Sequence, residues 1–353
     1  MGGFVVRLGL LGCGRIGDVH ARSAAKIESA QLVAVADLSL AAAERIALRS
    51  GAAVQAPEDL IASPDIDAVI IATPTSLHFD QIHAAAKAGK AIFCEKPIDL
   101  STDRALQCAE VVKAAGVPFI TAFNRRFDPH FAHLQAQLRK GVIGEVEMVV
   151  ITSRDPAPPP IAYIKQSGGL FRDMMIHDFD MARFLLGEEP IDVHATASCL
   201  VDPAIGAAGD VDTAAVTLRT ARGKLCQINN SRRAVYGYDQ RIEVHGSTGM
   251  LCAANAPEHF VEHAGNAGLT RAPHQHFFLE RYQMAYRREM EAFVQAVATK
   301  AQPFPGILDG IAAQKLADAA AKSYQVGAPQ QVDIVKKPAI LMGNELGFGA
   351  GCA

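Results

Sequence analysis

Residues 5–17 read VVRLGLLGCGRIG, an apolar run that ends in the glycine pattern GxGxxG at Gly12, Gly14 and Gly17. The glycine pattern alone is weak evidence. Here a predicted strand (5–11) precedes it, a helical stretch (18–27) follows it, and a second predicted strand (31–36) ends at Asp37. Strand, glycine turn, helix, strand and terminal acid together are typical of a dinucleotide-binding βαβ unit.

Each residue of this unit has a physical task. Gly12 and Gly14 let the backbone turn and approach a pyrophosphate, whose charge is stabilised at the helix N-terminus, and Gly17 lets helix and strand pack closely. Asp37 can accept hydrogen bonds from a ribose diol but would repel a 2'-phosphate, and Leu38 offers no cation. We therefore expect NAD rather than NADP, although a glycine turn without a ligand is the alternative. The predicted cofactor residues of the unit are Gly12, Gly14, Arg15, Ile16, Gly17 and Asp37.

The alternation of strand and helix continues with predicted strands at 68–72, 90–94 and 118–122. Alternation of this length predicts a doubly wound parallel sheet, a Rossmann fold, with ligands at the carboxyl ends of the strands. The polar residues expected at that edge, and hence at the cofactor, are Thr73, His78, Glu95, Lys96 and Asn124. His78 could instead be a surface residue at a helix N-terminus.

The tripeptide Glu95-Lys96-Pro97 carries two interpretations. A lysine at the carboxyl end of a strand, beside the nicotinamide, can donate to a substrate oxygen, and burial would tune its pKa. A lysine on an exposed loop is the other possibility. The peptide bond before Pro97 could be cis, although such bonds are mostly trans.

The pattern changes after Asn124. A predicted helix (129–140) leads to a long strand (145–153), the stiff stretch DPAPPP (155–160) and a helix that ends at Gly187. Alternating segments at 192–200, 211–220, 223–231 and 240–245 predict an antiparallel sheet with one covered face. The predicted organisation is a Rossmann domain (1–123), an α+β substrate domain with an open, mostly antiparallel sheet (124–335), and a tail of unknown role (336–353). The open sheet face could join copies of the chain, and helices at 282–299 and 310–325 are expected to pack on the body.

Asp173 and His177 lie four positions apart in DMMIHDFDMARFLL (173–186), which predicts one helix that places both side chains on the same face. Asp173 could hold the imidazole in one tautomer while His177 accepts a proton. Two alternatives stay open: an ordinary helix histidine, and a zinc site formed by Asp173, His177 and Asp180. No metal is expected, because hydride transfer to NAD does not require one.

The composition of the chain limits the classes of molecule that it is expected to bind. A chain of 353 residues fits two domains, and 34 basic against 37 acidic residues give a formal charge of −3, which offers no field for nucleic acid or anionic lipid. We find no run of 18 apolar residues, and the N-terminal apolar stretch is too short for a signal peptide. Seven cysteines without CxxC spacing argue against a disulfide framework or a zinc ribbon. These features favour a small soluble substrate and a cytoplasmic location.

Four sequence blocks in this order, GCGRIG, ATPTSLH, CEKP and GGLFRDMMIHDFDMARFL, resemble the Gfo/Idh/MocA family of glucose-fructose oxidoreductases and inositol dehydrogenases over residues 5–335. SRDPAPPP, GGLFRDM and IHDFDMARFLLG point to its bacterial inositol 2-dehydrogenase branch. The resemblance implies NAD-dependent oxidation of myo-inositol to 2-keto-myo-inositol (scyllo-inosose) by a cytoplasmic homotetramer. A dehydrogenase of another polyol, sugar or anhydrosugar, and a non-catalytic NAD-binding regulator, are the alternatives.

The same resemblance assigns roles to individual residues. Lys96 would polarise the reacting oxygen, His177 would take the hydroxyl proton, and Asp173 would orient His177. The residues expected to line the polyol pocket are Arg125, Asp155 and Tyr238. Some members of the family have His and Asn where this chain has Ser153 and Asp155, which affects the preferred polyol stereochemistry rather than the reaction.

Overall fold

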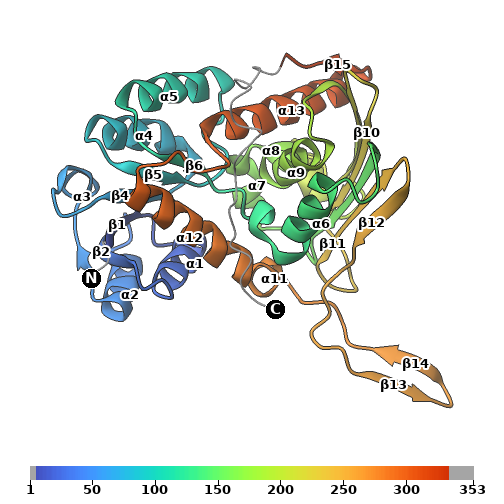
Figure 1. Ribbon diagram of the computed structural model, residues 1–353, viewed down its shortest axis with the longest axis horizontal. Helices are drawn as coiled ribbons and strands as arrows, with labels where there is room; N and C mark the ends of the chain where they lie inside the picture. Colours follow the sequence, from blue (N-terminus) through green and yellow to red (C-terminus); the bar gives the residue numbers. More distant parts are fainter. Residues whose placement is uncertain (1–4, 334–353) are drawn as a thin grey trace.

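The computed structural model describes residues 5–333, which form two sheets with helices packed on them (Figure 1). The first sheet has six parallel strands in the order β3-β2-β1-β4-β5-β6. Its strands are β1 (Val6–Leu11), β2 (Ala30–Ala36), β3 (Ala53–Val54), β4 (Ala68–Ile71), β5 (Ala91–Cys94) and β6 (Phe119–Thr121). The strand order reverses between β1 and β4, so a ligand crevice is expected at their carboxyl ends. The predicted Rossmann sheet is confirmed.

Helices cover both faces of this sheet because its strands are apolar on both sides. One face packs against α1 (Arg15–Ala24), α2 (Leu40–Ser50) and α12 (Gln283–Thr299). The other packs against α3 (Pro57–Ala62), α4 (His78–Lys87) and α5 (Thr102–Ala115), and a short 3-10 helix, η1 (Thr75–Leu77), precedes α4. In Figure 1, α12 runs beside α1, far from it in sequence. The C-terminal part of the chain therefore returns to complete the first core.

The second sheet has seven strands in the order β12-β11-β7-β10-β9-β8-β15. Its strands are β7 (Val146–Arg154), β8 (Pro190–Ser198), β9 (Thr213–Thr220), β10 (Leu225–Ser231), β11 (Asp239–Gly246), β12 (Gly249–Ala253) and β15 (Gln330–Gln331). The α-helices α6 (Pro129–Arg139), α9 (Ile176–Leu186) and α13 (Ile307–Val326) contribute to the core beneath it. Strand β9 alternates buried and exposed residues, so one face is covered and the other open, as predicted.

Shorter elements connect and extend this second unit. They are η2 (Asn124–Phe127), α7 (Ile161–Ser167), α8 (Gly169–Asp173), α10 (Pro203–Ala207), α11 (Phe278–Arg281), and a hairpin of β13 (Glu262–Gly265) and β14 (Gly268–Arg271). The hairpin projects from the body in Figure 1. Among the described residues, no helix is both long and apolar enough to span a membrane.

One expectation about local structure needs correction. The predicted single helix through Asp173 and His177 is two helices, α8 and α9, separated at Met174 and Met175. The break leaves the Asp173 carbonyl to accept a hydrogen bond from Lys96 Nζ at 2.7 Å. The second sheet is mostly antiparallel, as predicted, although β7 and β10 pair in parallel.

The predicted end at Gly187 is confirmed, since this residue adopts φ +66° after the last turn of α9. Strands β12, β13 and β14 were not predicted, because their exposed, glycine-rich segments carry no alternation of apolar and polar residues. The predicted tail 336–353 lies outside the described residues.

Candidate active site

The glycine loop between β1 and α1 has the shape that a pyrophosphate requires. Gly12 adopts φ +92°, and a Cβ there would lie 2.5 Å from the Ala72 carbonyl carbon, while a Cβ on Gly17 would overlap the Gly12 carbonyl oxygen. A Cβ on Gly14 would meet nothing within 4 Å, and no side chain among residues 5–333 caps the helix that begins at Arg15 and Ile16. The free amides at this helix N-terminus therefore fit the phosphates of a dinucleotide.

Asp37 lies beside this loop at the end of β2. Its Oδ2 accepts a hydrogen bond from the Cys13 amide at 2.6 Å, and its Oδ1 accepts one from the Ser39 amide at 2.7 Å. The next side chain, Leu38, is 94% exposed and brings no charge. Arg45 Nη2 is used to hold the Cys13 carbonyl at 2.9 Å. This arrangement suits a ribose diol, whose hydroxyls can donate to the carboxylate.

His78 supports the turns that carry two other predicted residues. It is buried, and its Nδ1 and Nε2 lie 2.9 Å and 3.0 Å from the carbonyl oxygens of Pro97 and Thr73. Burial lowers the pKa of this imidazole. The Thr73 hydroxyl donates to Gln81 at 2.6 Å. His78 thus fixes the turns after β4 and β5, and its direct contact with the cofactor stays a prediction.

Glu95 and Asn124 lie at the carboxyl ends of β5 and β6, as predicted. Glu95 Oε1 lies 2.7 Å from Nε2 of the buried His20 on α1, which ties the β5 edge to the helix of the glycine loop. The Asn124 side chain is 3% exposed, and its Nδ2 has no hydrogen-bond partner within residues 5–333. A buried unpaired amide at this edge is a donor still open to a ligand.

Lys96 and Asp173 meet at the centre of the site. Lys96 Nζ lies 2.7 Å from the Asp173 carbonyl oxygen and 3.3 Å from its Oδ1, and the Lys96–Pro97 peptide is cis. The Tyr163 hydroxyl donates to the same Oδ1 at 2.8 Å. The described hydrogen bonds of the Asp173 carboxylate therefore come from Lys96 and Tyr163 and not from His177, the partner that the sequence suggested.

His177 is poised as a neutral base. Its Nδ1 is buried without a hydrogen-bond partner in the described part of the chain, and its ring packs edge-on against Phe123 at 6.1 Å between centroids. Burial, with the charges of Lys96 and Arg125, lowers the pKa of the imidazole well below its usual value. A neutral imidazole near pH 7 can accept a proton.

Arg125 is held inside the second unit. Its Nη1 is paired with Asp178, its Nη2 donates to Ser153 Oγ at 3.2 Å, and Asn230 Nδ2 donates to the other oxygen of Asp178 at 2.9 Å. Burial opposes its charge, but Asp178 together with Tyr282 and Tyr238 more than offsets burial, and the pKa of Arg125 is raised. Arg125 is thus a fixed cation whose position Asp178 determines.

Asp155 and Tyr238 complete the predicted pocket residues. Asp155 follows β7, and burial raises the pKa of its carboxyl to about 7, while Arg232 and Arg125 oppose that rise. Tyr238 is buried, and its ring lies edge-on to Phe277 and Tyr282. Burial also raises the pKa of its phenol. An acidic group and a phenol against an aromatic wall suit a neutral ligand that is rich in hydroxyls.

Asp180 does not belong to the site. Its carboxylate accepts hydrogen bonds from Arg126 Nε and Nη2 at 2.7 Å and 2.6 Å, and it is 1% exposed. The zinc alternative, which required Asp180 as a ligand beside Asp173 and His177, therefore loses a ligand, and no group of three candidate ligands occurs within residues 5–333.

The sequence reasoning missed three residues near the centre: Tyr163, Asp178 and Arg232. Tyr163 lies on α7, directly after the proline-rich stretch and without a periodic signal. Asp178 adjoins His177, and its pairing with an arginine from η2 crosses 53 positions. Arg232 Nη2 lies 3.7 Å from Asp173 Oδ2. The sequence feature that could have identified Arg232 as a site residue is its position directly after the end of a predicted strand.

Comparison with known proteins agrees with this geometry. Residues 6–123 match a family model described as an oxidoreductase family with an NAD-binding Rossmann fold, and residues 131–252 match a GFO/IDH/MocA C-terminal domain. The chain is 55% identical to an inositol 2-dehydrogenase of Rhizobium meliloti, over 93% of this chain and 99% of that protein. It is 45% identical to a myo-inositol 2-dehydrogenase of Thermotoga maritima, over 91% and 96%.

A solved structure resembles the whole described fold. The crystal structure of scyllo-inositol dehydrogenase from Lactobacillus casei with bound NAD(H) and scyllo-inositol has a TM-score of 0.87 and 30% identity, and the match covers 93% of this chain and 99% of that one. The glycine loop, the Rossmann order and these matches point to one conclusion. The chain belongs to the Gfo/Idh/MocA family of oxidoreductases and carries its NAD-binding domain.

Proposed function

We propose that this protein oxidises myo-inositol at one ring hydroxyl to 2-keto-myo-inositol (scyllo-inosose). The observation that carries the proposal is the contact of Lys96 Nζ with Asp173 at the carboxyl edge of the Rossmann sheet, near His177, whose Nδ1 has no hydrogen-bond partner within residues 5–333. Support comes from relatives named inositol 2-dehydrogenase and myo-inositol 2-dehydrogenase, at 55% and 45% identity.

The residues divide the chemistry between them. When bound, NAD supplies the nicotinamide that accepts the hydride from the hydroxyl-bearing carbon. The imidazole of His177, kept neutral by burial and nearby cations, takes the hydroxyl proton. Lys96 donates a hydrogen bond to the reacting oxygen. Asp173 acts through its carbonyl and carboxylate, which hold the ammonium of Lys96 in place.

The cofactor residues are Gly12, Gly14, Arg15, Ile16, Gly17, Asp37, Thr73, Glu95, Lys96 and Asn124, with His78 in support. Arg125, Asp155 and Tyr238 bind the polyol in this proposal. The guanidinium of Arg125 can donate hydrogen bonds to the oxygens of polyol hydroxyls, and the carboxylate of Asp155 can accept hydrogen bonds from them. Because Arg125 is already neutralised by Asp178, the pocket is poorly suited to a phosphate or carboxylate substrate.

The experiment is a substrate panel with NAD, followed by the absorbance of NADH and by mass spectrometry of the product. Myo-inositol should give the highest kcat/KM, ahead of other inositol isomers, free sugars and sugar phosphates. Lys96→Met should lose most of the rate, whereas Lys87→Met, on the exposed end of α4, should keep it. A better free sugar or anhydrosugar would assign another substrate. NAD binding without turnover of any of these compounds would indicate a regulator.

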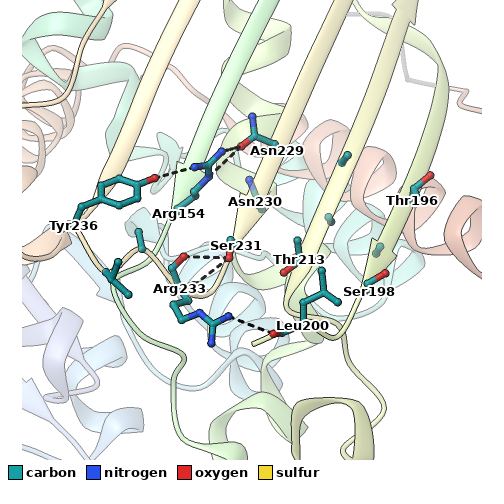
Figure 2. A pocket seen from close by; sticks show the side chains of 15 residues that line it. Arg154, Thr196, Ser198, Leu200, Thr213, Asn229, Asn230, Ser231, Arg233 and Tyr236 are labelled. Atoms are coloured by element: carbon teal, nitrogen blue, oxygen red, sulfur yellow. Dashed lines mark hydrogen bonds between the residues drawn. The ribbon is translucent and has the colours of Figure 1, made fainter. Parts of the chain in front are cut away.

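We also propose that copies of the chain assemble into a tetramer through the open face of the second sheet. Figure 2 shows a pocket on this face, where Arg154 links Tyr236 to Asn229, and small side chains such as Thr196 and Thr213 stand on neighbouring strands. Leu200 and Val235 at its rim are 68% and 90% exposed. An uncovered sheet face rimmed by apolar side chains favours burial against another protein surface.

A cytoplasmic location is part of the same proposal. The cysteines of the described chain are free thiols, at positions 13, 94, 108, 199, 226 and 252. Four of them are buried. Free thiols in this number are typical of proteins from a reducing compartment.

A further inference from the structure

The one parallel pairing described in the second sheet places Arg232 beside Asp155 and Asp173. Strands β7 and β10 pair in parallel, so their carboxyl ends meet at one edge. Asp155 is the first residue after β7 and Arg232 the first after β10, and the Asp155 amide donates to the Ser231 carbonyl at 2.9 Å. The Arg232 amide donates to the Asp212 carbonyl at 2.9 Å. Backbone hydrogen bonds therefore fix the positions of both Asp155 and Arg232.

The side chain of Arg232 is buried with unused donors. It is 1% exposed, and its Nε and Nη2 have no hydrogen-bond acceptor within residues 5–333. Its Nη2 lies 3.7 Å from Asp173 Oδ2 and 3.6 Å from Asp210 Oδ2, which is close enough for charge attraction but too far for hydrogen bonds. Asp210 Oδ2 is likewise buried without a partner in this part of the chain.

Three other buried arginines differ from Arg232 in how they are held, although Arg126 Nη1 and Arg281 Nε also have no hydrogen-bond partner within residues 5–333. Arg126 binds Asp180 through two nitrogens, Arg281 binds Asp128 through two nitrogens, and Arg125 binds Asp178 and Ser153. These guanidinium groups are anchored by hydrogen bonds, whereas Arg232 is only compensated in charge. Because unpaired buried donors are costly, such a group next to reacting residues indicates a ligand that supplies the missing acceptors.

We propose that Arg232 binds the substrate and helps to determine its specificity, by donating from Nε and Nη2 to hydroxyl oxygens of the polyol ring. A hydroxyl can accept from a guanidinium and at the same time donate to a carboxylate, so Arg232 and Asp155 together suit a ring that carries adjacent hydroxyls. The inference rests on the proposed function and assigns to it a residue that distinguishes polyols from their deoxy analogues. In this proposal Arg232 contacts hydroxyls other than the reacting one, which Lys96 and His177 serve.

The test is a substrate–variant cycle on the full-length protein with NAD. Arg232→Met keeps the length of the side chain and removes its donors, and kcat/KM for myo-inositol should fall roughly 10- to 100-fold, mainly through KM. The KM for NAD should not change. The matched control is Arg222→Met, because Arg222 is exposed and precedes the start of β10, whereas Arg232 follows its end. This variant should behave as wild type.

Monodeoxyinositols then separate recognition from a merely structural role. For the analogue that lacks the contacted hydroxyl, wild type and Arg232→Met should agree within roughly twofold, because the interaction is already absent. An equal loss for every analogue would overturn the proposal, as would an unchanged KM for myo-inositol. If wild type turns over no polyol, the proposed function itself fails. Should Arg232→Met not fold, Arg232→Lys runs the same cycle, and failure of both to fold would show that Arg232 is structural.

Discussion

At the scale of single residues, His177 determines how kcat depends on pH. Its pKa is lowered, so it loses its proton at a lower pH than an ordinary histidine, and a base must be neutral to accept a proton. We therefore expect His177 to be fully deprotonated at pH 7. The activity should fall only at a pH well below the usual pKa of a histidine. His177→Ala should lower kcat roughly 10²- to 10⁴-fold and leave NAD affinity intact. The checks are kcat as a function of pH and NAD titration by fluorescence. A mutant with the parent's rate, or a wild-type profile that follows an ordinary imidazole, would contradict the assignment.

Asp37 carries the second residue-scale prediction, a preference for NAD over NADP of at least roughly tenfold, about 1.4 kcal/mol. A 2'-phosphate would meet the carboxylate that the Cys13 and Ser39 amides hold in place. The double change Asp37→Ala with Leu38→Arg should shift the preference toward NADP, whereas Leu38→Arg alone should keep most of it. The measurement is kcat/KM for both cofactors. Equal values in wild type would refute the role of Asp37.

At the scale of elements, the sequence predicted five of the six Rossmann strands, because strands such as β1, β4 and β5 are short buried runs that end at a turn, but it did not predict β3, which is short and exposed. It could not predict the break between α8 and α9, because local spacing is helical there. At the break, the Asp173 carbonyl accepts a hydrogen bond from Lys96, 77 positions away, a contact that no local pattern encodes. Likewise, the sequence could not distinguish the role of Arg125 from that of Arg232, because the difference lies in the residues that surround each side chain in the folded protein. Patterns along the chain thus located the site, and contacts between distant elements assigned the roles within it.

Gly169, at the start of α8, gives the element-scale prediction. It adopts φ +83°, and a Cβ there would lie 2.7 Å from Asp210 Oδ1, the oxygen that accepts from the Leu170 amide. Gly169→Ala should therefore lower the free energy of unfolding by about 1–2 kcal/mol, the typical cost of a left-handed backbone conformation for a residue with a Cβ, and should also displace Asp210. Gly187→Ala has φ +66° with nothing within 4 Å and should show the strain alone. Thermal unfolding and the KM for myo-inositol measure both effects, and equal losses in the two variants would exclude a special role for the Gly169–Asp210 contact.

At the scale of the whole molecule, the open face of the second sheet carries the last prediction. Ala215 is exposed on β9 and stands opposite Asn229 on β10 and Thr196 on β8, in the middle of the face proposed to join copies of the chain. Ala215→Arg places a long charged side chain there without touching the core beneath, so the tetramer should dissociate while the far-ultraviolet circular dichroism stays native, since burying an unpaired charge is costly. Ala41→Arg, exposed on α2 of the NAD-binding unit, is the control that should stay assembled. Light scattering after size-exclusion chromatography gives the mass of each. A wild-type monomer, or an Ala215→Arg variant as large as wild type, would show that this face does not join the subunits.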